Sequence, residues 1–135
     1  MKNIVKLFIV MFTLIIFTNC YDRDIIDRKD FNHTLSSVEN LAVNQEGNSA
    51  IITWQFPNDI SDNFRRPVEV SIQVVEDNIY RQKVTLFEEE TRAEIVIDPT
   101  KEYRFVVKLV GFLVPDAREE GFTDRVFSDG NIAEL

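Results

Sequence analysis

Residues 68–75, VEVSIQVV, decide the fold class, because apolar and polar side chains alternate along them with a period of two. The apolar positions 68, 70, 72 and 74 would line one face of a strand, and the polar positions between them the other face. The stretch 103–109, YRFVVKL, repeats this pattern with apolar side chains at 103, 105, 107 and 109. We therefore predict two half-buried strands, each with one face in the core, as in antiparallel sheets.

Shorter runs, of which the first is irregular, flank these two strands. They cover residues 38–43, 50–56, 79–86, 93–97 and 122–127, and turn residues such as Gly47 and Pro57 separate them. Seven short strands, with a Trp on the second and a Tyr opening the sixth, are typical of an immunoglobulin-like β-sandwich. We predict an all-β sandwich domain over residues 37–128.

Two motifs carry a more specific pattern: residues 54–57, WQFP, and residues 97–107, IDPTKEYRFVV. With Trp54 and Pro57 at the end of the second strand, and Pro99 and Tyr103 around the turn before the sixth, residues 38–128 resemble a fibronectin type III domain. The resemblance implies structural roles for these four residues. It makes Tyr103 a corner tyrosine, whose hydroxyl binds the turn back to the backbone. An unrelated sandwich is the alternative.

The composition excludes several classes of function. The chain has fifteen Lys and Arg against twenty-three Asp and Glu, a formal charge of −8, whereas nucleic-acid binding needs clustered basic residues. The single Cys cannot form a disulfide within the chain, and one Cys with one His cannot complete a zinc site of these ligands. The length of 135 residues fits one compact domain.

The arrangement of basic and apolar residues in 1–19 is typical of a secretory signal peptide. Lys2 and Lys6 lead into an apolar run at residues 7–17, which is shorter than the about 20 residues that span a bilayer. Cys20 follows, so this segment resembles a bacterial lipoprotein signal. The resemblance implies cleavage before Cys20 and a covalent lipid on its thiol, and we expect no other cofactor. The alternatives are an ordinary signal peptide and an uncleaved signal anchor.

Residues 20–36 carry dense mixed charge without a period, which predicts a flexible tether between Cys20 and the sandwich. Asp22 and Asp24 resemble the surface-export signal of Bacteroides-type outer-membrane lipoproteins, with a periplasmic position as the alternative. We expect the lipid alone to hold the protein on its membrane, because an acidic body is not attracted to anionic lipid. Residues 129–135 are predicted to form a C-terminal tail.

We expect neither an enzyme nor a metal site. His33 falls in the predicted tether, so no Ser-His or Cys-His pair is indicated. Asp59, Asp62 and Asp116 lack the spacing of a calcium loop.

The two longest loops of the predicted sandwich, after the second and the sixth strand, emerge at the same pole. Their candidate binding residues are Phe64, Arg65 and Arg66 in the first loop and Phe112, Asp116 and Arg118 in the second. Aromatic faces beside Arg and Asp can stack on a sugar or anchor a protein. The alternative is that both phenylalanines fold back onto the end of the sandwich. The first strand starts at this pole, so the loops would face the tether.

These features predict a non-catalytic module of the cell envelope that binds a partner or acts as a spacer. The lipoprotein resemblance implies an accessory role in glycan capture, with an outer-membrane transporter or another envelope protein and a glycan as partners. The rival prediction is a structural or adhesive surface subunit that pairs through an exposed strand edge.

Overall fold

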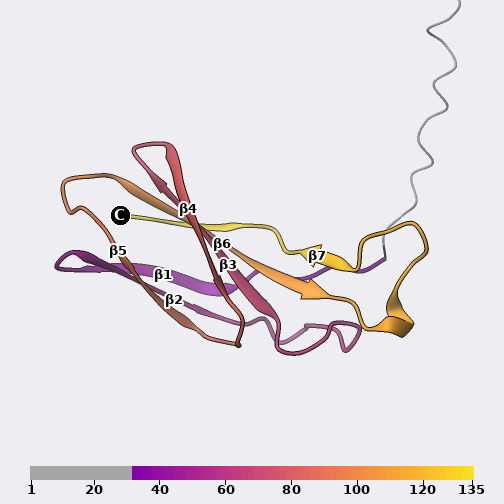
Figure 1. The fold of residues 1–135 in the computed structure, drawn as a ribbon. Helices are drawn as coiled ribbons and strands as arrows, with labels where there is room; N and C mark the ends of the chain where they lie inside the picture. Colours follow the sequence, from indigo (N-terminus) through magenta and orange to yellow (C-terminus); the bar gives the residue numbers. More distant parts are fainter. Residues whose placement is uncertain (1–31) are drawn as a thin grey trace, which may run out of the picture. The chain divides into compact units, whose positions relative to one another are not determined.

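The computed structural model of the protein describes residues 32–135, which form two antiparallel sheets (Figure 1). One sheet has the order β1-β2-β5, and the other has the order β4-β3-β6-β7, with β8 also paired to β6. The strands are β1 (Glu39–Glu46), β2 (Ser49–Gln55), β3 (Glu69–Glu76), β4 (Ile79–Leu86), β5 (Arg92–Val96), β6 (Tyr103–Phe112), β7 (Arg125–Phe127) and β8 (Asn131–Glu134). The prediction of an all-β, immunoglobulin-like sandwich is confirmed.

The core lies between the two sheets and is built from the alternating positions that the sequence indicates. The inward side chains of β3 and β6 are fully or almost fully buried, and β2 and β5 supply the opposing layer. Those residues are Val70, Ile72 and Val74; Phe105, Val107 and Leu109; Ala50, Ile52 and Trp54; and Ala93 and Ile95. Because this period holds in both sheets, a one-residue slip of any of these strands would expose its apolar side.

The predicted C-terminal tail is wrong, because residues 131–134 form β8 and pair with β6. The predicted strand over 122–127 is shorter than expected and begins at Arg125. Between β7 and β8 the ladder continues through Ser128, whose Oγ accepts a hydrogen bond of 2.9 Å from the backbone N–H of Leu109. The sequence signal is weak because β8 has only four residues, of which Ala133 alone is buried.

Tyr103 makes the link that the resemblance implies for a corner tyrosine. Its hydroxyl accepts a hydrogen bond of 3.0 Å from the N–H of Asp98 and donates one of 2.7 Å to Oε2 of Glu76. This hydrogen bond, with a second from Arg81, holds the pKa of Glu76 below its usual value of 4.5. The β5–β6 turn is thereby tied to the end of β3. Trp54 and Pro57 are buried, and Pro99 is exposed in the turn.

The predicted tether is wrong for residues 32–36, which pack on the sandwich. Leu35 is only 6% exposed, and Ser36 Oγ donates a hydrogen bond of 2.7 Å to Asp59. The signal segment 1–19 and the lipidation residue Cys20 lie outside the described residues. In the part of the chain that is described, no helix is long and apolar enough to cross a membrane.

Candidate functional site

The loop pole, formed by loops 56–68 and 113–124, brings together the two predicted loops and the start of the body (Figure 1). The loops are joined by backbone hydrogen bonds of 2.8 Å, from Arg65 N–H to Phe112 O and from Val114 N–H to Asn63 O. The segment before β1 reaches both loops: Ser36 bonds to Asp59, and His33 Nε2 lies 3.4 Å from Oε1 of Glu119. The loop pole is therefore the end of the sandwich at which residues 32–38 join it.

Phe64 belongs to the core and not to a binding surface. It is 3% exposed, and its backbone bridges to Leu113. A Cβ added at Gly111 would lie 2.6 Å from Cδ1 of the Phe64 ring, so the ring packs directly on the β6 backbone. The prediction of Phe64 as a ligand contact is wrong, and it folds back as the alternative reading proposed.

Phe112 is half-buried and lies under two guanidinium groups. Cζ of Arg65 is 5.4 Å from the ring centroid and Cζ of Arg125 is 5.7 Å from it. Arg125 also lies 4.8 Å from the ring centroid of Phe127. These are cation–π distances. The guanidinium groups compete with any sugar for the faces of Phe112, so this ring is a poor stacking platform.

A hollow of about 390 Å³ opens beside these residues. Its walls combine aromatic, basic and acidic side chains: Arg65, Arg66, Pro67, Glu69, Phe87 and Phe112. Three of the six predicted binding residues, Arg65, Arg66 and Phe112, therefore line one surface. We call it the polar-aromatic hollow.

Phe87 is the residue of this hollow that sequence reasoning missed. Its side chain is 66% exposed, directly after the end of β4. A signal was present, since an apolar aromatic side chain precedes the triplet 88–90, EEE. Glu89, in the loop after β4, does not line the hollow but accepts a hydrogen bond of 2.7 Å from Nη1 of Arg66, and this hydrogen bond lowers the pKa of Glu89.

Asp116 and Arg118 do not line the hollow. Asp116 is exposed in the short 3-10 turn Pro115–Ala117, and Arg118 forms an ion pair of 3.1 Å with Asp124. Loop 113–124 therefore contributes no residue to the hollow, and Phe112 lines it from the end of β6.

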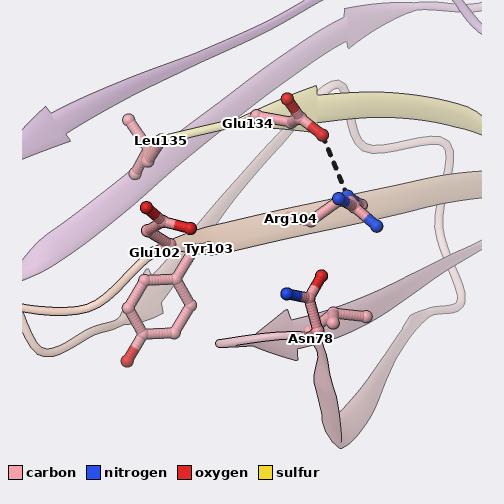
Figure 2. A pocket seen from close by; sticks show the side chains of 7 residues that line it. Asn78, Glu102, Tyr103, Arg104, Glu134 and Leu135 are labelled. Carbon is pink, nitrogen blue, oxygen red and sulfur yellow. Dashed lines mark hydrogen bonds and ion pairs between the residues drawn. The ribbon is translucent and has the colours of Figure 1, made fainter.

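A second hollow, of about 460 Å³, lies at the opposite end, near the C-terminal residues (Figure 2). Arg104 Nε and Glu134 Oε1 pair across it at 2.9 Å, and Asn78 from the β3–β4 turn points toward them (Figure 2). Its walls are polar and open. Among residues 32–135, no three His, Cys, Asp or Glu side chains are grouped so that they could hold a metal ion.

The fold and the loop pole define a small immunoglobulin-like sandwich domain with a mixed polar and aromatic surface at one end. The chain belongs to the family of the domain of unknown function DUF4945, whose model matches residues 20–135. No curated protein is significantly similar to the chain in sequence.

Proposed function

We propose that the protein is a lipid-anchored, non-catalytic module of the cell envelope that binds a partner near its membrane. The sequence of residues 1–20 supports an acylated Cys20. The family match, which begins at Cys20 and leaves out residues 1–19, agrees with cleavage at this position. Asp22 and Asp24 favour the outer membrane and its outer surface over the periplasm.

The observation that carries this proposal is that the chain joins the sandwich at the loop pole. Twelve residues, 20–31, precede the described body from Cys20 onward. Even fully extended, twelve residues span at most about 43 Å. The polar-aromatic hollow would therefore stay within a few nanometres of the lipid, where a transporter or another envelope protein is within reach.

The hollow has the chemistry of a recognition surface. Phe87 offers an exposed aromatic side chain, while Arg65 and Glu69 supply donors and an acceptor beside it. Its lining includes one carboxylate, Glu69, and no Ser, Cys or His. Such a set can bind a glycan or a protein loop and supports an accessory role in glycan capture. It does not support acid–base or nucleophilic catalysis.

The anchor is tested by growing cells that express the full chain with an alkyne-labelled fatty acid. We expect label on the wild-type protein, retention in the membrane fraction, and loss of both in Cys20→Ser. The matched control is Thr18→Ser, a conservative change inside the signal, which should keep both the label and the retention. Equal labelling of Cys20→Ser and the wild type would contradict the anchor.

The binding surface is tested on a glycan array with the full chain and Phe87→Ala. The matched control is Val96→Ala, because Val96 is an apolar side chain, 80% exposed, on the other sheet. We expect binding that Phe87→Ala weakens and Val96→Ala leaves unchanged. Equal effects of the two variants would show that the hollow is not the site.

A second candidate is a structural or adhesive subunit that assembles through strand edges. Strands β4 and β5 each end a sheet, and within residues 32–135 neither has a second neighbour. Unpaired edges can add a strand from another chain. However, β4 carries Arg81 and Lys83, and such charges discourage edge pairing. Concentration-dependent self-association in analytical ultracentrifugation would favour this candidate.

A further inference from the structure

The outer face of the five-stranded sheet has a charge opposite to that of the body. Residues 32–135 contain ten Lys and Arg against nineteen Asp and Glu, a formal charge of −9. Strand register places the following charged residues at outward positions: Lys83, Arg104, Lys108 and Arg125, against Glu69 and Glu134. Arg65 adds another positive charge beside Phe112. We call this surface, with Arg65, the basic sheet face.

Most of these cations have no carboxylate partner. Arg104 pairs with Glu134, but among residues 32–135 no carboxylate lies within 4 Å of the charged groups of Arg65, Lys83, Lys108 or Arg125. In the same part of the chain, Arg66, Arg81, Lys101 and Arg118 all have acidic partners. Unpaired cations gathered on one face of an acidic domain produce a local positive potential, which attracts an anionic ligand.

The cations follow a diagonal across the sheet. Arg125 lies opposite Phe112, four residues from Lys108 along β6, which corresponds to about 14 Å. Lys108 lies opposite Ser71 on β3, and Lys83 on β4 lies opposite Gln73. Lys83 is therefore two strands and two residues away from Lys108, a distance of about 12 Å. The three positive charges therefore extend over about 25 Å of the outer sheet face. A ligand that meets all three must be elongated and carry repeated negative charge.

The distribution of apolar side chains distinguishes a polysaccharide from a protein partner. The centre of the face carries a cation, Lys108, between the outward positions Val106 and Val110 of β6, and no large exposed apolar side chain lies there. The exposed apolar side chains lie toward the two ends, with Phe127 at one and Ile132 and Tyr80 at the other. Protein interfaces show the reverse arrangement, an apolar centre and a polar rim, and their centres are depleted of charge.

We propose that the basic sheet face binds an acidic polysaccharide, which lies along the diagonal from Arg125 through Lys108 to Lys83. The carboxylate or sulfate groups of the polysaccharide pair with these cations. The inference rests on the proposed function and names its ligand class. It also extends the binding surface from the polar-aromatic hollow across the sheet.

The test measures binding of the full chain, purified in a neutral detergent, to polygalacturonate and to dextran sulfate. Methyl-esterified polygalacturonate and neutral dextran are the uncharged controls with the same backbones. The face variant is Lys83→Gln with Lys108→Gln, and the control variant is Arg92→Gln with Arg118→Gln. Both change the net charge by the same amount, but only the first pair lies on the basic sheet face.

We expect binding to at least one charged polymer, no binding to its uncharged form, and weakening on addition of salt. Two exposed charge contacts of about 0.7 kcal/mol each correspond to about tenfold weaker binding in the face variant. The control variant should change binding less than about twofold. Circular dichroism of both variants checks that they are folded.

The proposal fails if neither charged polymer binds, if the uncharged forms bind equally, or if both double variants lose binding equally. Binding of poly-L-glutamate alone, with the same dependence on Lys83 and Lys108, would assign the face to an acidic protein and overturn the polysaccharide. These failures differ from a failure of the proposed function. Fatty-acid labelling at Cys20 and binding of neutral glycans that depends on Phe87 are measured independently of this face.

Discussion

Replacing Phe64 by alanine separates a core residue from a ligand residue. The ring is 3% exposed and packs on the backbone at Gly111. Truncation of a buried Phe to Ala costs about 3–5 kcal/mol, and we expect the lower end, about 3 kcal/mol, because the loop pole can partly collapse into the space. With a urea dependence of about 1.5 kcal/mol/M, the unfolding midpoint should fall by about 2 M.

The fluorescence of Trp54 provides the signal for the assay, because Trp54 is the only Trp in the chain and is 2% exposed. Its fluorescence in a urea titration of the purified protein reports global unfolding. The control is Phe87→Ala, which removes an exposed Phe near the same pole and should change stability by less than about 0.5 kcal/mol. A midpoint shift for Phe64→Ala no larger than that of the control would refute the assignment of Phe64 to the core.

Three further predictions concern contacts outside the hollow. Tyr103→Phe removes the hydroxyl that binds Asp98 N–H and Glu76, and should destabilise the protein by about 1–2 kcal/mol in the same urea assay; an unchanged midpoint would show that the corner link is dispensable. Leu35→Ala should lower the free energy of unfolding by about 2–3 kcal/mol because Leu35 is buried, whereas Thr34→Ala, at an exposed neighbour, should leave it unchanged. Equal effects of the two variants would show that residues 32–36 are a tether and do not pack on the sandwich. Hydrogen bonds to Tyr103 and Arg81 lower the pKa of Glu76, and hydrogen bonds to Lys101 and Glu102 N–H lower the pKa of Asp77. Ionisation of these two carboxyl groups therefore stabilises the folded state fully above their unfolded-state pKa values, near 4, and this stabilisation is lost as the pH falls below those values. Urea midpoints should therefore be level from pH 7 to about pH 5 and fall at lower pH, with a smaller fall in Glu76→Gln; identical pH profiles would contradict this role for Glu76.

Most of the fold could be predicted from the sequence because its signals are local. The alternation in residues 68–75 and 103–109 specified both the strands and their buried faces, as β3 and β6 show. The corner tyrosine was predicted from the resemblance of residues 97–107 to the fibronectin type III pattern. Residues 131–134 and 32–36 were misassigned because each is short and without a period. They are ordered by pairing with β6 and by packing on loops that are distant in the sequence.

The candidate site was predictable only in part. The loops and the pole followed from the strand order, and Arg65, Arg66 and Phe112 do line one hollow. The sequence could not distinguish Phe64 from Phe112, since both are phenylalanines predicted in loops that carry arginines. Phe64 is buried because β6 places Gly111 under its ring. Phe112 has its guanidinium contact with Arg125 because β7 places Arg125 beside it.

The sequence by itself determined the β class, the strand faces and the acidic character of the chain, and it carries the lipoprotein-like signal on which the proposed anchor rests. These properties depend on composition and on residues close together along the chain. Only the tertiary structure decided which side chains share a surface: Phe87 with Arg65 in the hollow, and Lys83, Lys108 and Arg125 on one sheet face. The physical reason is strand register, because pairing residues far apart in the chain sets which charges meet a carboxylate and which face the solvent.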